Sequence, residues 1–285
     1  MKKIAIWFLA FIITVGAVYY QRKTGPTHPK TDTVVFADSS WTVKLIRSNG
    51  ARDARVKLPM KDPEVSAILY FKRYRVNEDW KAVDFEMEVL RGHPSMSKKK
   101  KSTKALKEVF VAYLPQQESA GKLEYYIELN GYGSQTFISR DAPVVIRFKG
   151  DVPAAVLIPH ILLMFLSMMI ATLAGLFAIF KIDRFRRYTF WTFGILFIGG
   201  FIFGPWVQWY AFGDWWTGVP YGWDLTDNKT LFAFVFWIAA VIGNRKKARP
   251  GLVILAAIMT LVIFSIPHSM FGSELDYATG EVTQG

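Results

Sequence analysis

Five long apolar runs decide what this chain can fold into. They cover residues 4–20, 152–180, 188–206, 231–243 and 252–266. A helix needs about 20 predominantly apolar residues to cross the hydrocarbon of a bilayer, and most of the runs approach that length. The fourth run reaches it only if its helix starts near Asp227. We therefore expect an N-terminal membrane segment (residues 1–20) and, much later, a bundle of four transmembrane helices (residues 151–272).

The composition supports this class and excludes some chemistry. With 52% hydrophobic and 16% aromatic residues in 285, the chain is too apolar for one soluble domain of this length. It has no cysteine, which excludes disulfides, thiolate metal sites and iron–sulfur clusters.

The charges beside the apolar runs predict the orientation, because cytoplasmic flanks of membrane spans are enriched in lysine and arginine. The basic flanks carry Lys2, Lys3, Lys181, Arg184, Arg186, Arg187, Arg245, Lys246, Lys247 and Arg249. The opposite flanks carry Asp151, Asp214, Asp224, Asp227, Glu274, Asp276 and Glu281, against the single basic residue Lys229. Residues 21–150 and the C-terminal tail (residues 273–285) are therefore expected outside the cytoplasm.

The first apolar run fits two kinds of segment. Lys2 and Lys3, an apolar stretch and the small residues up to Ala17 are typical of a signal peptide that is cleaved. Tyr19 and Tyr20 just beyond favour an uncleaved anchor instead. Both alternatives export the next part of the chain, a linker over residues 21–32 and then a domain.

Residues 33–150 are predicted to form an all-β domain, because several short stretches alternate apolar and polar residues. The inward-facing sets are expected to be Phe85, Met87 and Val89; Leu123, Tyr125, Ile127 and Leu129; and Val144, Ile146 and Phe148. About seven or eight such strands predict a β-sandwich.

Two stretches of this domain are similar to a known module. Residues 110–117 (FVAYLPQQ) and 121–129 (GKLEYYIEL), followed by Gly131, resemble the late hairpin of immunoglobulin-like, fibronectin type III-like domains. Residues 67–80 resemble the middle strand pair of such a domain. The resemblance covers about residues 60–150 and implies a fold but no ligand, since this fold hosts unrelated functions.

The helical half resembles a known family only around one histidine. Residues 160–164 (HILLM) are similar to the first haem-binding helix of cytochrome b561-like proteins, which implies haem b as a cofactor. That family generally spaces further ligands inside its helices, whereas the other histidine here, His268, stands at the end of the last apolar run.

Two Ile-Pro-His triplets, at residues 158–160 and 266–268, define the candidate site. The predicted topology puts His160 and His268 at the same outer depth, beside an acidic surface. Imidazole and carboxylate are ligands for zinc, copper, iron or manganese, so we predict a divalent transition metal. Asp227 ranks first among the carboxylates as a candidate ligand, followed by Asp224 and Glu274. Further candidates at the outer end of the predicted helices are Met164, Met270, Asp214 and Trp223. The alternative is that each histidine only bonds to water or a carbonyl at the interface.

The sequence leaves the function class open. We rank a metal above haem because an acidic outer face repels haem propionates. No nucleophile–base pair, phosphate loop, nucleotide fingerprint or metalloprotease helix is present, so enzymatic activity stays undecided. The rival class is a non-catalytic envelope scaffold that contacts the bilayer and other envelope membrane proteins. The lysine run at residues 98–101 is interpreted as a solvated exported loop and not as a nucleic-acid site, because no aromatic residues interleave with it.

Overall fold

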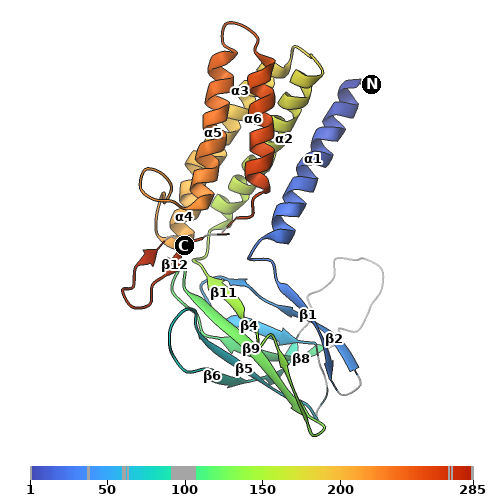
Figure 1. The fold of residues 1–285 in the computed structure, drawn as a ribbon, viewed down its shortest axis with the longest axis vertical. Coiled ribbons are helices and arrows are strands. Elements are labelled where there is room, and N and C mark those ends of the chain that lie inside the picture. Colours follow the sequence, from blue (N-terminus) through green and yellow to red (C-terminus); the bar gives the residue numbers. More distant parts are fainter. Residues whose placement is uncertain are drawn as a thin grey trace. The chain divides into compact units, whose positions relative to one another are not determined.

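A computed structural model describes residues 2–36, 39–59, 62, 64–90, 107–268, 270 and 272–283, which form two compact units (Figure 1). The helical unit consists of Met1–Pro26, Gly150–Glu274 and Glu281–Gly285. The β unit consists of Thr27–Lys149 and Leu275–Gly280, so part of the predicted C-terminal tail belongs to it. The lysine run at residues 98–101 lies outside the described residues.

Every predicted apolar run is helical. The helices are α1 (Lys2–Thr24), α2 (Ala154–Ile179), α3 (Phe185–Phe197), the π-helix η1 (Ile198–Phe203), α4 (Gly204–Phe212), α5 (Leu225–Gly243) and α6 (Pro250–Ser265). The chain runs from α3 through η1 into α4 without a break. In the part of the chain that the structure describes, four segments are long and apolar enough to cross a membrane, namely Lys3–Thr24, Ala154–Ile179, Phe185–Phe212 and Leu225–Gly243. The last helix, α6, is shorter, with 16 residues.

The two prolines of the Ile-Pro-His triplets act differently. Helix α6 ends at Ser265, because Ile266 precedes Pro267 and adopts an extended conformation. Pro159, in contrast, lies inside a helix, because α2 begins at Ala154 and continues through it. The proline ring has no N–H to donate, so one backbone hydrogen bond is missing near the beginning of α2.

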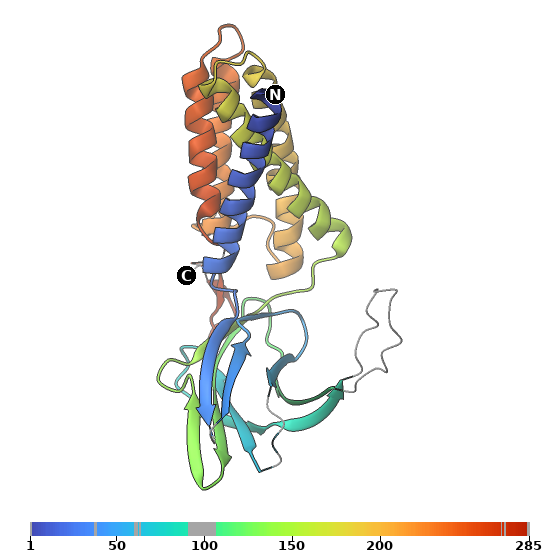
Figure 2. The ribbon, with the colours of Figure 1, turned by 90° about the vertical axis from the view of Figure 1, so that its right-hand side faces the viewer.

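Helix α2 is central to the helical unit. It packs against α1, α3 and α6, while α5 packs against α3 and α6 (Figure 2). Trp237 of α5 is fully buried, and its Nε1–H donates to Thr260 Oγ1 of α6 at 2.8 Å. This bond satisfies the polar atom of a large buried ring and joins the two helices.

Glycines in η1 let this segment lie close to two other helices. A Cβ atom added at Gly199 would lie 2.9 Å from Leu163 Cβ of α2, and one at Gly200 would lie 2.6 Å from Thr230 Cγ2 of α5. Small residues permit such close approach of helices in membranes. A Cβ atom at Gly194 of α3 would meet nothing within 4 Å.

We predict that Gly200→Ala destabilises the helical unit, because the new methyl group overlaps Thr230. Overpacking of this kind costs about 1–3 kcal/mol. Thermal unfolding of the purified protein should show a lowered midpoint for Gly200→Ala and an unchanged or raised one for the matched control Gly194→Ala. Equal midpoints for the two variants would contradict the close packing.

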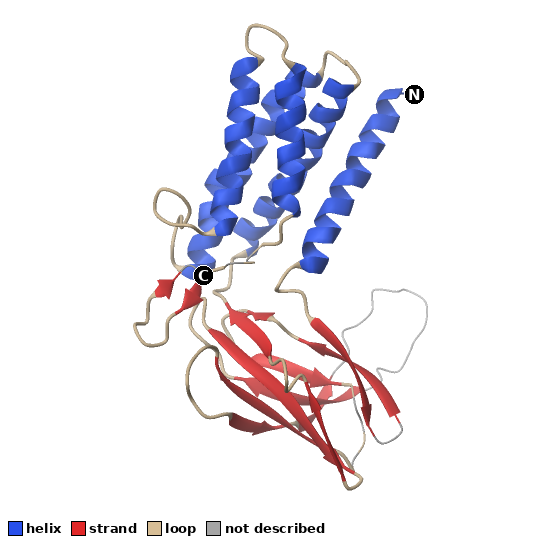
Figure 3. Ribbon diagram, viewed as in Figure 1, coloured by secondary structure: helices blue, strands red, loops and turns tan. Residues whose placement is uncertain are grey.

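Within the described part of residues 27–149, the strands form three sheets, drawn red in Figure 3. The strands are β1 (Lys30–Phe36), β2 (Ser39–Leu45), β3 (Ser48–Asn49), β4 (Ala54–Leu58), β5 (Ser66–Arg73), β6 (Lys81–Asp84), β7 (Glu86–Leu90), β8 (Lys107–Leu114), β9 (Lys122–Gly131), β10 (Ser134–Ile138) and β11 (Val144–Phe148). A six-stranded sheet has the order β3-β11-β9-β5-β6, with β10 also paired to β9. A three-stranded sheet has the order β4-β8-β7, and β1 pairs with β2. In the tail, β12 (Glu274–Leu275) and β13 (Val282–Thr283) are short strands.

One core joins the three sheets of the β unit. It includes Val43 of β2, Val56 of β4, Leu69 of β5 and Ile127 of β9, each fully buried. Tyr125 of β9 is also buried, and its hydroxyl donates to the carbonyl of Ile46 at 2.9 Å. Burial raises the pKa of the Tyr125 phenol well above its ordinary value, because the charged form would lose its hydration.

The predicted strand faces are confirmed in β9 and β11, whose apolar sets are all buried. The face predicted for Phe85, Met87 and Val89 is wrong, since Phe85 is buried but Met87 is 45% and Val89 54% exposed. The chain leaves the six-stranded sheet after β6 and enters the three-stranded sheet at β7, which resets the alternation. The hairpin expected from residues 110–129 is not formed either: β8 pairs with β4 and β7, whereas β9 pairs with β5, β10 and β11.

Candidate functional site

His160 has a fixed orientation in the helical unit. It lies on α2, half-buried, with its Nδ1 2.9 Å from the carbonyl oxygen of Gly199. A carbonyl oxygen can only accept a hydrogen bond, so the neutral imidazole carries its proton on Nδ1. The lone pair is therefore on Nε2, which is the nitrogen left to act as a base or as a metal ligand.

The carbonyl that holds His160 belongs to the π-helix η1. In this segment the Gly204 N–H also donates to the Gly199 carbonyl, a bond that spans five residues. Single π-helical turns inside α-helices are rare and frequently occur at functional sites. The segment η1 thus combines close packing at its glycines with a backbone acceptor for His160.

His268 lies just beyond the end of α6. Lys229 and His160 both act electrostatically on its imidazole. The two histidines of the Ile-Pro-His triplets are therefore within electrostatic range of each other, on α2 and after α6. Whether they share one ligand stays a prediction.

Lys229 is a further polar residue of this region, although it was not among the ligands predicted from the sequence. It lies near the start of α5 with 3% of its surface exposed, and its Nζ donates to the carbonyl of Ile266 at 2.5 Å. The Asp224 carboxylate acts on it electrostatically. In the sequence, its position just before the apolar run 231–243 was the signal that could have identified it as a candidate site residue. Ionisable groups at membrane depth are rare and tend to be functional.

Both aspartates of the predicted metal site have structural partners. Asp224 caps α5: its Oδ1 accepts from the backbone N–H groups of Thr226 at 2.8 Å and Asp227 at 3.1 Å. Asp227 Oδ2 accepts from the backbone N–H of Thr217 at 2.7 Å and from the Thr217 hydroxyl at 3.1 Å. The two carboxylates thus hold the beginning of α5 and the loop before it, which we call the α4–α5 loop (residues 213–224).

The remaining predicted ligands are dispersed. Asp214 is exposed in the α4–α5 loop, Trp223 is 81% and Met270 49% exposed, and Glu274 is half-buried in the tail. Met164 packs on η1, with Sδ 3.2 Å from the place of a Cβ at Gly199. Among the residues that the structure describes, no three His, Asp or Glu side chains form a group able to hold a metal ion. Metal binding by His160 and His268 stays a prediction.

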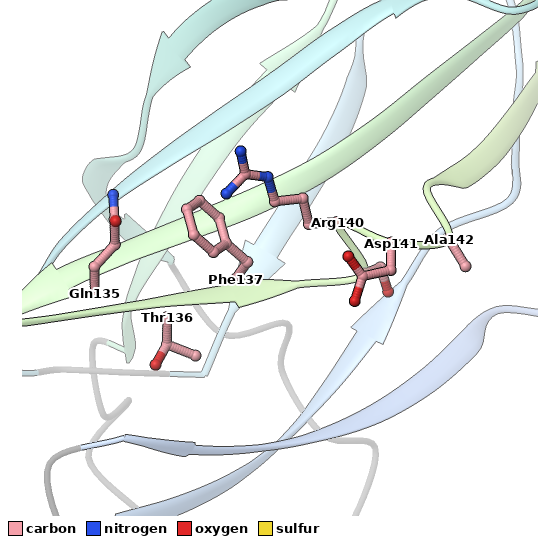
Figure 4. Close-up of a pocket in the computed structure, with 7 residues that line it drawn as sticks. Gln135, Thr136, Phe137, Arg140, Asp141 and Ala142 are labelled. Atoms are coloured by element: carbon pink, nitrogen blue, oxygen red, sulfur yellow. The ribbon is translucent and has the colours of Figure 1, made fainter.

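The β unit carries a separate surface depression of about 560 Å³ at the end of β10 (Figure 4). It is lined by Gln135, Thr136, Phe137, Ser139, Arg140, Asp141 and Ala142. The guanidinium carbon of Arg140 lies 4.1 Å from the centre of the Phe137 ring. The depression therefore combines an aromatic ring with several hydrogen-bonding groups.

Comparison with protein-family models, with curated proteins and with solved structures finds no match for this chain.

We predict that Asp227→Ala loosens the α4–α5 loop, because the Thr217 N–H loses its acceptor. An unsatisfied buried donor costs about 1–3 kcal/mol, which corresponds to roughly tenfold faster amide exchange or more. Hydrogen–deuterium exchange should accelerate in residues 213–222 of Asp227→Ala and stay unchanged in the control Asp214→Ala, whose side chain is exposed. Equal exchange in both variants would show that the Asp227 carboxylate does not hold the α4–α5 loop.

Proposed function

We propose that the protein is a multi-pass membrane protein that holds its β unit on the extracytoplasmic side. The observation that carries this proposal is the gathering of basic residues at one end of the helical unit. The α2–α3 and α5–α6 loops meet there: the Arg186 guanidinium donates to the carbonyl of Asn244 at 2.6 and 3.0 Å and to that of Arg245 at 2.9 Å. Figure 3 shows both loops and the N-terminus at this end.

The opposite end of the helical unit is where the chain continues into the β unit. Helix α1 ends there and α2 begins there, and the acidic residues Asp214, Asp224 and Asp227 belong to the same end (Figure 1). Since basic flanks stay in the cytoplasm, this arrangement supports export of the β unit. It does not depend on whether the first segment is cleaved.

For the β unit we propose an immunoglobulin-like or fibronectin type III-like sandwich that serves as a binding module. Support comes from the sheets of six and three strands, which contribute their buried faces to one core. A fold of this kind specifies no chemistry by itself. The protein is then a non-catalytic component of the cell envelope, with the helical unit as its anchor.

The topology is testable directly because the chain contains no cysteine. Single-cysteine variants Ser134→Cys, in the β unit, and Lys246→Cys, in the α5–α6 loop, place a thiol at exposed positions. A membrane-impermeant maleimide added to intact cells should label Ser134→Cys at once and Lys246→Cys only after permeabilisation. Labelling of Lys246→Cys in intact cells would overturn the orientation.

A second candidate function is a transition-metal site at His160 and His268. It is favoured by one observation, the hydrogen bond from His160 Nδ1 to the Gly199 carbonyl. Metal-ligating histidines commonly donate their other ring N–H to a carbonyl or carboxylate, which fixes the ring and its tautomer. The nearby Lys229 ammonium opposes binding of a cation, so such a site requires further ligands, and haem b remains the alternative cofactor.

Metal analysis and an optical spectrum of the purified protein test this second candidate. Stoichiometric zinc, copper, iron or manganese that is lost in His160→Ala and His268→Ala but kept in the control His28→Ala would support it. A Soret band would support haem instead. If the wild-type protein contains neither a stoichiometric metal nor a Soret band, this second candidate function is wrong and only the anchor function remains.

A further inference from the structure

The outer face of the six-stranded sheet carries a row of four aromatic side chains. Phe137 of β10, Tyr126 of β9, Tyr70 of β5 and Trp80, just before β6, form what we call the aromatic row. Ring centres are separated by 6.3 Å for Phe137 and Tyr126, 4.9 Å for Tyr126 and Tyr70, and 4.8 Å for Tyr126 and Trp80. Tyr126 is nearly buried by the other three, which are half-buried and leave part of each ring open.

The strand register puts these rings on the face that points away from the core. Tyr70 is directly opposite Tyr126 in the ladder, and Phe137 is opposite Glu128. Their neighbours Leu69 and Ile127 are fully buried, and side chains alternate between the two faces of a strand. The core of the β unit is complete without the aromatic row, so burial in that core does not account for it.

A fixed polar group lies beside the aromatic row. The Glu128 carboxylate accepts hydrogen bonds from Asn130 Nδ2 at 2.7 Å and from Gln135 Nε2 at 2.8 Å, and also from the Tyr70 hydroxyl. The bond from Asn130 and then that from Gln135 hold the pKa of Glu128 below its ordinary value. Donors and acceptors on three strands are thereby ordered in advance on the surface.

Each end of the aromatic row is bordered by a cation. Lys72 Nζ lies 5.0 Å from the centre of the Trp80 ring, and Arg140 lies over Phe137, beside the depression of Figure 4. Lys72 also forms an ion pair with Glu124 at 3.3 Å, and the charge of Arg140 acts on Glu128. Charges of both signs therefore border the aromatic row, so it is not surrounded by a block of one sign that would attract a highly charged polymer.

We propose that the aromatic row and its polar border bind a neutral glycan strand, an inference that rests on the proposed export of the β unit. The faces of aromatic rings are electron-rich, so they attract the positively polarised C–H groups of a pyranose ring. The sugar hydroxyls can donate and accept hydrogen bonds, which suits the carboxylate and amide groups of Glu128, Asn130 and Gln135. The rings of Phe137, Tyr70 and Trp80 each contact that of Tyr126, so together they form one patch that can contact a short stretch of a glycan.

Calorimetric titration of the full-length protein tests this proposal. The protein is held in lipid nanodiscs, because detergents with sugar headgroups would compete. The probes are soluble hexasaccharides of β-1,4-linked glucose, β-1,4-linked N-acetylglucosamine and α-1,4-linked glucose. We expect the wild-type protein to bind at least one of them, and Trp80→Ala and Gln135→Ala to weaken that binding about tenfold or more, a change of roughly 1.4 kcal/mol each.

The matched control is Tyr113→Ala, which removes an aromatic side chain, 42% exposed, from the three-stranded sheet of the same unit. It should bind the hexasaccharide like the wild-type protein. Gln135→Ala keeps the test valid if Trp80→Ala fails to fold, because Gln135 is exposed at the sheet edge. Binding of none of the three probes by the wild-type protein, or equal loss in Tyr113→Ala, would overturn the proposal. Labelling of Ser134→Cys in intact cells decides export independently, so the two failures are distinguishable.

Discussion

The hydrogen bonds in the first turn of α5 hold the acidic end of the helical unit together. Hydrocarbon supplies no partners for backbone groups, so the ends of membrane helices must be satisfied by the protein or at the interface. Asp224 caps the helix, Asp227 and Asn228 receive N–H groups of the α4–α5 loop, and Lys229 donates to Ile266. Four polar side chains in and just before one turn thereby join the loop, α5 and the segment after α6, which carries His268.

The helical architecture could be predicted because length and apolarity are local properties. The length needed to cross a bilayer also predicted the start of α5 near Asp227, and alternation predicted the buried faces of β9 and β11. The wrong predictions concern features that depend on tertiary structure, such as the face of a strand that is buried. The step from β6 to β7 crosses between sheets and exposes Met87 and Val89, and nothing in the local pattern marks such a step.

The candidate site was only partly accessible from sequence. Matching triplets drew attention to His160 and His268, but the partner of His160 is a carbonyl in a π-helix 39 residues away. Asp224 caps α5, a role that aspartate commonly takes just before a helix, whereas the role of Asp227 depends on Thr217 in an irregular loop. The aromatic row comes from four chain segments, so its existence depends on a strand register that periodicity cannot supply.

The central claim is that the helical unit spans a bilayer with its basic loops on one side. Spin labels on single cysteines along the exposed positions Phe232, Val235, Ile238 and Ile242 of α5 measure depth in nanodiscs. We expect accessibility to oxygen to be greatest at Phe232 and Val235, near the middle of α5, and to fall toward Ile242, with accessibility to a water-soluble nickel complex changing in the opposite direction. High nickel accessibility along the whole helix would contradict the claim.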